Sequence, residues 1–220
     1  VEEGNSKVRA IWGYPATIGF QESCFALPLI EAYRNGNYPL AYGYETATGG
    51  HRRISHRFRQ YSNFLSTDFK SFDKTIPPWL IYRAFDILTD NIDFTAYKDR
   101  GHPDPQALFK AWKYLIDYFI NTPIRLANGE RYRKRQGVAS GSYFTQLIDS
   151  ICNWIITTYC VRKCDRLVKD ILVLGDDSLT AIDGHISVSD FAKHAQVFGM
   201  SINLEKSNYH INLYNVKFLG

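Results

Sequence analysis

The feature that most constrains the fold is a pair of short apolar runs separated by an acidic turn. Residues 171–174 (ILVL) and 179–182 (LTAI) flank the sequence GDDS. Short apolar runs on either side of a tight polar turn predict an antiparallel β-hairpin. Asp176 and Asp177 then lie at its tip, where adjacent carboxylates repel each other unless cations neutralise them. For this hairpin alone, a solvated turn is the simpler interpretation, because Gly and Asp are common turn residues.

The rest of the chain combines helix signals with further strand signals. Apolar residues at helical spacing predict helices over about 105–121, from 77–78 onward, over 142–164 and over 187–198. Asp104 is a predicted N-cap, and Ser187 with Asp190 forms a predicted capping box. A short apolar run precedes Asp68, and residues 200–204 and 209–213 predict a second hairpin. The pattern indicates an α+β fold, with an antiparallel sheet and helices packed on one face.

Length and composition set the limits of this fold. A chain of 220 residues that is 45% hydrophobic can bury a core and forms one or two domains. No stretch reaches the roughly 20 apolar residues that a membrane span requires. The four cysteines form no CxxC pair, so we expect free thiols in a reducing compartment. The only methionine is Met200, which predicts that the chain is an internal piece of a larger protein.

Two clusters of cations are candidate nucleic-acid contacts. Residues 51–60 (HRRISHRFRQ) contain no acid, and residues 131–135 (RYRKR) hold four cations in five positions. Each cluster taken alone is more simply explained as solvated surface. If they bind a nucleic-acid backbone, the contacting side chains are Arg52, Arg53, Arg57, Arg59, Arg131, Arg133, Lys134 and Arg135.

Asp68 gives the acidic hairpin a chemical interpretation. Two divalent ions about 4 Å apart need carboxylates from more than one strand. An acid at the end of one strand and a pair on a neighbouring hairpin supply that arrangement, and Mg²⁺ prefers such oxygen ligands. Asp73 follows Asp68 by five residues in DFKSFD, a spacing that is weak evidence alone.

Residues 137–153 (GVASGSYFTQLIDSICN) form the most specific segment. A Ser-Gly-Ser sequence before a helix can offer backbone N–H groups and hydroxyls to an anion or a ribose. Within the helix, a polar stripe at i, i+4 and i+8 lies beside the apolar one. An N-capped helix with an ordinary wet face is the alternative. The polar residues concerned are Ser140, Gly141, Ser142, Thr145, Asp149 and Asn153.

These segments, in this order, resemble motifs A, B and C of viral RNA-dependent RNA polymerases. Motif A is DFKSFD, motif B is SGSYFTQLIDS and motif C is LGDDS. Residues 7–15 (KVRAIWGYP) resemble motif F, residues 205–207 the end of motif D, and residues 218–220 the opening of motif E. The residues of motifs F and B are most similar to those of polymerases from double-stranded RNA viruses of the partitivirus and picobirnavirus kind. The resemblance covers essentially the whole chain, and six ordered matches are far more specific than any single one.

The resemblance implies a right-hand polymerase palm with partial fingers and no thumb. Residues 1–60 would then be a fingers segment, 61–90 the palm with motif A, 91–135 a fingers–palm insertion, and 136–220 the palm with motifs B, C, D and the start of E. The fragment by itself is expected to be inactive.

The resemblance also assigns roles to single residues. Asp68 and Asp176, supported by Asp177, would hold two Mg²⁺ ions, with Mn²⁺ as a substitute. Lys206 would protonate the leaving pyrophosphate, or else be an ordinary turn lysine. Contacts to the incoming nucleotide are implied for Lys7, Arg9, Asp73, Ser140, Gly141 and Thr145.

One position departs from the pattern of many plus-strand relatives. Those polymerases carry an asparagine nine residues after the motif B serine, and here that position is Asp149. Asn153 lies one helical turn further on. Either residue is therefore a candidate for contact with the sugar.

The implied activity is template-directed RNA synthesis from ribonucleoside triphosphates, for viral genome replication and transcription. Its partners would be the RNA template, the RNA product and a viral capsid protein, without a membrane, in the virion interior or host cytoplasm. A reverse transcriptase is one alternative, although those enzymes typically carry Tyr-x-Asp-Asp and an aromatic residue where Asp73 stands. A non-catalytic RNA-binding palm is the other.

Overall fold

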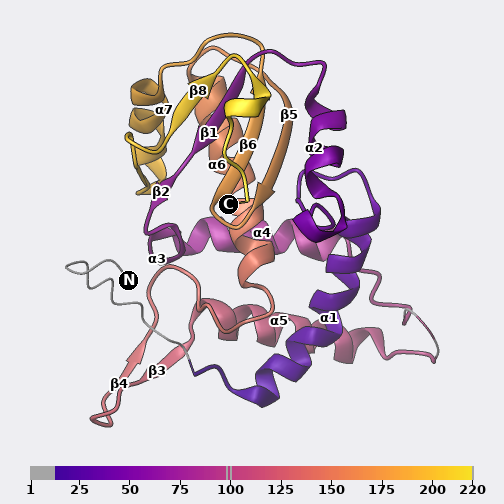
Figure 1. Ribbon diagram of the computed structural model, residues 1–220. Coiled ribbons are helices and arrows are strands. Elements are labelled where there is room, and N and C mark those ends of the chain that lie inside the picture. The colour runs from indigo at the N-terminus through magenta and orange to yellow at the C-terminus, as the bar shows by residue number, and fades with distance from the viewer. Residues whose placement is uncertain (1–12, 98, 100, 220) are drawn as a thin grey trace.

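The computed structural model describes residues 13–97, 99 and 101–219. Its centre is an antiparallel sheet of four strands in the order β5-β6-β1-β8 (Figure 1). These strands are β1 (Phe64–Thr67), β5 (Val168–Leu174), β6 (Asp177–Ile182) and β8 (Asn208–His210). The predicted hairpin around the acidic turn is confirmed as β5 and β6. β1 lies between β6 and β8, so the strand that leads into Asp68 is an inner one.

One face of the sheet is covered by α6 (Thr145–Lys163). Behind it pack α4 (Pro78–Asp90) and α7 (Val188–Ala195), and α5 (Pro105–Ile120) packs on α4. All four predicted helices are present, although α6 begins later than predicted and residues 196–198 form a 3₁₀ turn. The Asp104 side chain caps α5 by accepting from two backbone N–H groups. Ser187 makes no such capping bond, so the predicted capping box of α7 is wrong.

The opposite face of the sheet is also covered, which corrects the expectation of helices on one face only. α2 (Gly50–Phe58) lies there and contributes Ile54 and Phe58 to a second, smaller apolar cluster. Side chains alternate along a strand, so Phe64 of β1 joins this cluster whereas Leu65 joins the larger core. Phe218 closes the same cluster.

The predicted hairpin over residues 200–213 is wrong. β7 (Ser201–Ile202) pairs with β2 (Phe69–Lys70), and β8 pairs with β1. Both strands therefore pair with the segment that carries Asp68 rather than with each other. The turn between them is held to Asp68 itself, whose N–H donates to Ser207 Oγ (2.9 Å) and whose carbonyl accepts from the Asn203 N–H (2.8 Å).

The remaining α-helices and strands of the described residues lie around this centre. α1 (Ala16–Asn35) packs on α5, and β3 (Pro123–Arg125) with β4 (Arg131–Arg133) forms a separate ribbon that projects from the body (Figure 1). α3 (Phe72–Thr75) is a single turn after β2. All four cysteines have free thiols. Among the described helices, none is long and apolar enough to cross a membrane.

Candidate active site

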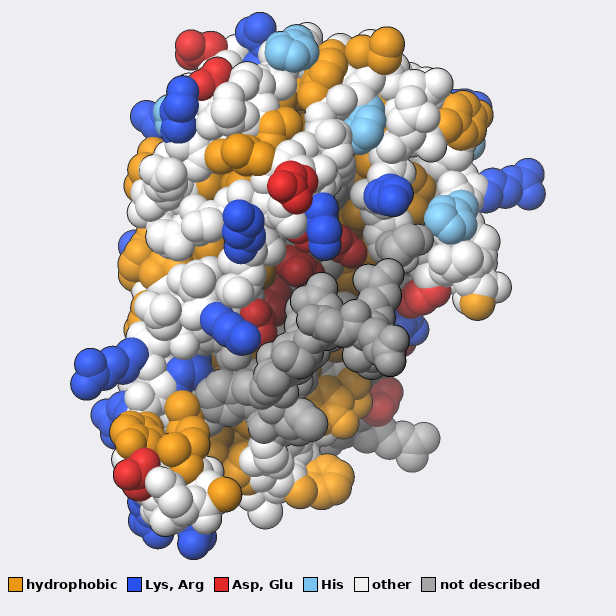
Figure 2. Space-filling model, turned by 60° about the vertical axis from the view of Figure 1, so that its left-hand side comes forward, with side chains coloured by type: hydrophobic (Ala, Val, Ile, Leu, Met, Phe, Trp, Pro, Cys, Tyr) orange, Lys and Arg blue, Asp and Glu red, His pale blue; other side chains and the backbone are white. Residues whose placement is uncertain are grey.

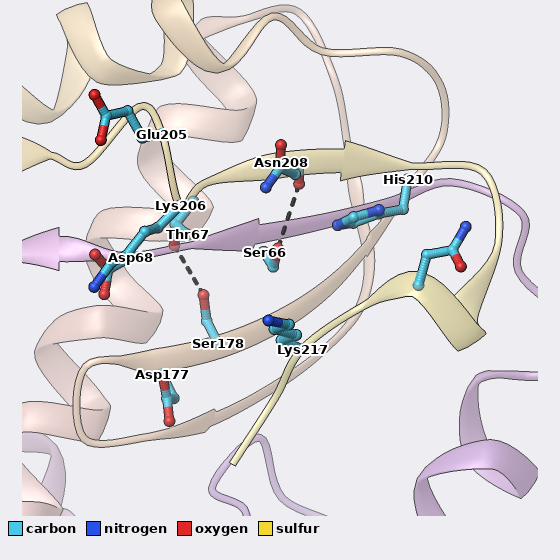
Figure 3. A pocket seen from close by; sticks show the side chains of 11 residues that line it. Ser66, Thr67, Asp68, Asp177, Ser178, Glu205, Lys206, Asn208, His210 and Lys217 are labelled. Atoms are coloured by element: carbon cyan, nitrogen blue, oxygen red, sulfur yellow. Dashed lines mark hydrogen bonds between the residues drawn. The ribbon is translucent and has the colours of Figure 1, made fainter. Parts of the chain in front are cut away.

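The register between β1 and β6 brings two of the predicted acids together at the same end of these neighbouring strands. Thr67 lies opposite Ser178, and their hydroxyls are 3.0 Å apart. The next residue along each strand is Asp68 on one side and Asp177 on the other. Both residues line one pocket (Figure 3), and Asp176 lies in the turn directly before β6. The sheet therefore places all three acids next to each other.

The three carboxylates influence one another electrostatically. Partial burial raises the pKa of Asp177, and the negative charges of Asp176 and Asp68 raise it further. Within residues 13–97, 99 and 101–219, no group of three acidic, His or Cys side chains is arranged to hold a metal ion. The crowded like charges and hard oxygen donors nonetheless fit a divalent cation, which would relieve their repulsion.

Lys206 enters the same pocket from the turn between β7 and β8. Its side chain extends toward Asp68, whereas the neighbouring Glu205 points away (Figure 3). His210 and Lys217 line the pocket further from the acids. Figure 2 shows acidic side chains gathered in a hollow near the middle of one face, with Lys and Arg side chains around it. Anionic substrates can therefore meet cations at the rim and acids inside.

A close backbone contact joins the segment after Asp68 to the segment before α6. The Val138 N–H donates to the Asp73 carbonyl (2.7 Å), and the Gly137 N–H donates to the Ile76 carbonyl (2.8 Å). Gly137 has φ +74°, and a Cβ there would lie 2.5 Å from the Asp73 carbonyl oxygen. Glycine is thus required for Asp73 to lie beside the Ser-Gly-Ser loop.

Some polar groups of the Ser-Gly-Ser loop are exposed to solvent, and others form hydrogen bonds within the loop. Ser140 and Gly141 are exposed, as a ligand-binding role requires. Thr145 is half-buried, and its hydroxyl donates to the Ala139 carbonyl (2.6 Å). Thr145 therefore helps to fold the loop and retains only acceptor capacity for a ligand.

Asp149 is a buried acid beneath the site. It is 7% exposed, and its Oδ1 has no hydrogen-bond partner among the described residues. Burial raises its pKa well above the usual range, and the charges of Asp73 and Asp176 act in the same direction. Lys134 opposes them, so Asp149 shares one electrostatic environment with the catalytic candidates.

Asn153 is held differently. Its amide nitrogen donates to the carbonyls of Gly175 (3.1 Å) and Asp177 (3.3 Å), and its amide oxygen accepts from Thr157 Oγ1 (2.9 Å). The side chain is fully buried. Asn153 is therefore engaged with the acidic turn, whereas Asp149 keeps an unpartnered oxygen.

Glu22 contributes to the site although no motif in the sequence singles it out. Its carboxylate is completely buried and accepts from Ser142 Oγ (2.8 Å), the Tyr143 N–H (2.9 Å) and Tyr14 Oη (2.6 Å). Burial raises its pKa, although the three donors act against the rise. The available signal is positional, because Glu22 lies at helical spacing within the buried stripe of Ile18, Ala26, Leu29 and Tyr33.

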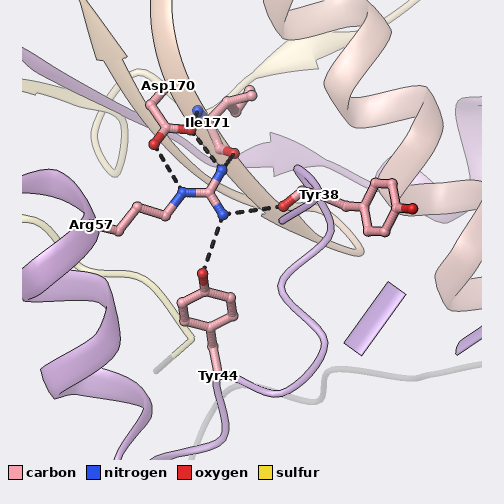
Figure 4. Close-up of polar contacts among 5 residues, drawn as sticks. All are labelled: Tyr38, Tyr44, Arg57, Asp170 and Ile171. Carbon is pink, nitrogen blue, oxygen red and sulfur yellow. Dashed lines mark hydrogen bonds and ion pairs between the residues drawn. The ribbon is translucent and has the colours of Figure 1, made fainter. Parts of the chain in front are cut away.

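The predicted RNA-binding cations divide into two groups. Arg57 is enclosed by an ion pair with Asp170 (2.7 and 2.8 Å) and by bonds to the Tyr44 hydroxyl and the Tyr38 carbonyl (Figure 4). Lys134 is buried, donates to the Gly137 carbonyl and lies over the Phe119 ring. The other six are exposed: Arg52, Arg53, Arg59, Arg131, Arg133 and Arg135. Lys7 and Arg9 lie outside the described residues.

Comparison with known proteins identifies relatives along the whole chain. The family model described as "Viral RNA-dependent RNA polymerase" matches residues 4–220. The RNA-directed RNA polymerase of Cryptosporidium parvum virus 1 is 29% identical over 100% of this chain and 42% of its own length. That of White clover cryptic virus 1 is 27% identical over 98% of this chain and 39% of its own. The chain thus spans about two fifths of these curated relatives.

Solved structures agree on the fold. The RNA-dependent RNA polymerase of a human picobirnavirus superimposes with a TM-score of 0.73, at 22% identity, over 91% of this chain and 36% of its own. An insertion-loop deletion mutant of such a polymerase gives a TM-score of 0.75, at 20% identity, over 96% of this chain and 39% of its own. The expected kinship with double-stranded RNA virus polymerases is confirmed.

Proposed function

Because the chain belongs to the viral RNA-dependent RNA polymerase family, we propose that it forms the catalytic palm and part of the fingers of such an enzyme. Its activity is template-directed RNA synthesis from ribonucleoside triphosphates. The observation that carries the proposal is the β1–β6 register, which aligns Asp68 with Asp177 beside Asp176. The palm comprises residues 61–90 and 136–220, residues 1–60 belong to the fingers, and 91–135 form an insertion between them.

Asp68 and Asp176, with Asp177 in support, would hold two Mg²⁺ ions, for which Mn²⁺ can substitute. When bound, these ions lower the pKa of the attacking 3′-hydroxyl and stabilise the leaving pyrophosphate. The repulsion that raises the pKa of Asp177 supports this role, because cations would relieve it. Lys206 extends toward Asp68, where it can donate a proton to pyrophosphate.

The nucleotide is oriented by groups next to these acids. Lys7 and Arg9 hold the triphosphate, and Ser140 and Gly141 lie exposed beside Asp73. Asp73 accepts from the ribose hydroxyls, and Thr145 can accept as well. Of the two remaining candidates, Asp149 is the sugar-sensing residue, because the Asn153 side chain is already fully bonded.

The backbones of the RNA template and product lie against the exposed cations. These are Arg52, Arg53 and Arg59 near α2, and Arg131, Arg133 and Arg135 on and after β4. Arg57 and Lys134, which are enclosed within the protein, serve to hold the fold. A viral capsid protein is the further partner, and the virion interior or host cytoplasm is the place of action.

The test is template-dependent incorporation of labelled ribonucleotides by a longer polymerase that contains this chain. Asp176→Ala should abolish synthesis, a loss of at least about three orders of magnitude, since charge stabilisation dominates this chemistry. RNA binding should remain within about twofold, because cations elsewhere supply it. Retention of a tenth of wild-type synthesis by Asp176→Ala would contradict the assignment. A wild type that binds RNA without incorporation would indicate a non-catalytic palm, and incorporation of deoxynucleotides alone a reverse transcriptase.

A further inference from the structure

Three buried polar residues on one face of α6 form a hydrogen-bonded group that supports the acidic turn. Ser150, Asn153 and Thr157 are each completely buried, and they lie at i, i+3 and i+7 on the helix. Buried polar side chains are costly unless they are hydrogen-bonded. All three are bonded here, either to the turn or to the residue that contacts it.

The contacts reach the backbone on both sides of Asp176. The Gly175 N–H donates to Ser150 Oγ (2.8 Å), and Ser150 Oγ donates to the Gln146 carbonyl (2.6 Å). Asn153 donates to the carbonyls of Gly175 and Asp177 (3.1 and 3.3 Å). All of these hydrogen bonds join a side chain to a backbone group, and none of them involves a carboxylate of the acidic turn.

Thr157 holds the other end of the Asn153 amide. The carbonyls of Gly175 and Asp177 can only accept, so the amide nitrogen must face the turn and the amide oxygen must face away from it. The Thr157 hydroxyl donates to that oxygen (2.9 Å), and without it the buried oxygen would lose this hydrogen bond. Thr157 therefore acts on the turn through Asn153 and has no contact with it of its own.

Electrostatic repulsion acts on the turn that these residues support. The register of β1 and β6 sets Asp68 beside Asp177, and Asp176 adjoins Asp177 in the chain, so three like charges are crowded at this position and repel one another. The turn enters through Gly175 at φ +64°, a residue with few conformational restrictions. Repulsion would displace a turn that is held only by its two strands.

We propose that Asn153, Ser150 and Thr157 are positioning residues that hold the Asp176–Asp177 turn against this repulsion, so that its carboxylates can share cations with Asp68. The inference rests on the proposed function. The inference extends that function, because it means that the metal affinity of the site is set in part by three side chains of α6 that do not ligate metal.

The chain offers a matched set of variants at neighbouring positions of α6. Thr157→Val removes the hydroxyl that donates to Asn153 Oδ1, and Thr157→Ser retains it. Thr158→Val makes the same chemical change one residue along, where Thr158 Oγ1 is buried without a hydrogen-bond partner among the described residues. Asn153→Leu is the stronger change, because it removes both donors to the turn without adding a charge that would itself attract a cation.

The measurement is Mn²⁺ binding by the longer polymerase that contains this chain, followed by the electron paramagnetic resonance signal of free Mn²⁺. Thr157→Val should raise the Kd by about fivefold, the factor that corresponds to one lost hydrogen bond. Asn153→Leu should raise it more than about tenfold. Thr157→Ser and Thr158→Val should stay within twofold of wild type. The Mg²⁺ concentration that gives half-maximal synthesis should rise in the same order.

Melting temperature and RNA affinity separate positioning from loss of fold. A variant that binds RNA normally and melts with wild type, yet binds Mn²⁺ weakly, supports the proposal. Equal Mn²⁺ affinity in Thr157→Val and Thr158→Val, or an Asn153→Leu protein with wild-type affinity, would overturn it. The two proposals fail separately: loss of the proposed function would appear as absent synthesis in the wild type, whereas Mn²⁺ binding remains measurable in an inactive protein.

Discussion

At the scale of single residues, the site contains two buried acids in different circumstances. Glu22 accepts hydrogen bonds from three donors, and two of them, Ser142 Oγ and the Tyr143 N–H, belong to the loop before α6. Asp149 has an oxygen without a partner and faces the charges of Asp73 and Asp176. A satisfied acid of the first kind supports structure, whereas an unsatisfied one near substrate is a candidate for ligand contact.

Asp73 should set the preference for ribonucleotides. A deoxynucleotide offers no 2′-hydroxyl and leaves the acceptor unpaired, at a cost of roughly 1–3 kcal/mol. That corresponds to roughly tenfold to hundredfold discrimination from this contact. Asp73→Ala should therefore erode the ratio of kcat/KM for GTP to that for dGTP on one RNA template. Asp73→Tyr should lower kcat/KM for GTP more than that for dGTP. An unchanged ratio in Asp73→Ala would show that Asp73 does not contact the sugar.

Glu22 should make stability depend on pH. Its pKa in the folded protein is raised from the ordinary 4.5, with burial as the main cause. Between these two values the unfolded chain has released a proton that the folded chain retains, so stability falls as pH rises. The advantage of wild type over Glu22→Gln in melting temperature should therefore be largest below about pH 4.5 and shrink toward neutral pH. The exposed Glu205→Gln is the control, and a difference that does not vary with pH would contradict the assignment.

At the scale of secondary-structure elements, β5 is an outer strand that the protein has covered. Its backbone bonds with residues 39–41, where the Ala41 N–H donates to the Val173 carbonyl and the Val173 N–H to the Pro39 carbonyl (2.8 Å each). The ion pair between Arg57 of α2 and Asp170 of β5 closes the same edge (Figure 4). Uncovered edges invite pairing with other chains, so α2 protects the strand that leads into the acidic turn.

Removal of Arg57 should destabilise this edge. The two side chains of the pair are 16% and 19% exposed, so Arg57→Ala leaves the Asp170 carboxylate largely buried without its cation. We expect a loss of about 2–3 kcal/mol in the free energy of unfolding, somewhat below the ~3–5 kcal/mol of a fully buried pair. Arg59→Ala, at an exposed position one residue past α2, should change it by less than about 0.5 kcal/mol. Equal denaturation midpoints for the two variants would show that the pair contributes little.

At the scale of the whole molecule, one group of acids lies apart from two groups of exposed arginines. The acids gather in the hollow (Figure 2), and the exposed arginines occur on α2 and on the β3–β4 ribbon. Burial separates arginines with similar sequence contexts, since Arg57 is enclosed whereas Arg52, Arg53 and Arg59 are exposed. Only exposed cations can displace counterions from an RNA backbone.

The ribbon cations should therefore contribute to the salt dependence of RNA binding. Replacing Arg131, Arg133 and Arg135 together by alanine should weaken binding to all sequences alike and reduce the slope of log affinity against log salt by up to about 2. The matched control neutralises Arg83, Lys110 and Arg162, three exposed cations on α4, α5 and α6. A slope equal to that of wild type would show that the ribbon cations are solvated surface and do not contact RNA.

Local patterns in the sequence were sufficient for most elements and for the principal acids. The β5–β6 hairpin, helices α4 and α5, and the strand before Asp68 follow from apolar periodicity and turn residues, which act over a few positions. The same patterns were insufficient for β7 and β8, because each pairs with a strand more than 130 residues away rather than with its neighbour. Strand partners depend on which edges remain open after the rest of the sheet has formed.

The sequence by itself determined the polymerase motifs, their order and the three carboxylates, because each lies within a short segment whose residue types carry the chemistry. Only the tertiary structure decided the partners of the buried polar groups. It assigned Asn153 and Ser150 to the acidic turn, Glu22 to the loop before α6, and Arg57 to Asp170. The physical reason is burial. A polar group removed from water must find its hydrogen bonds wherever the fold brings a complementary group, and these partners lie 22 to 120 residues away in the chain.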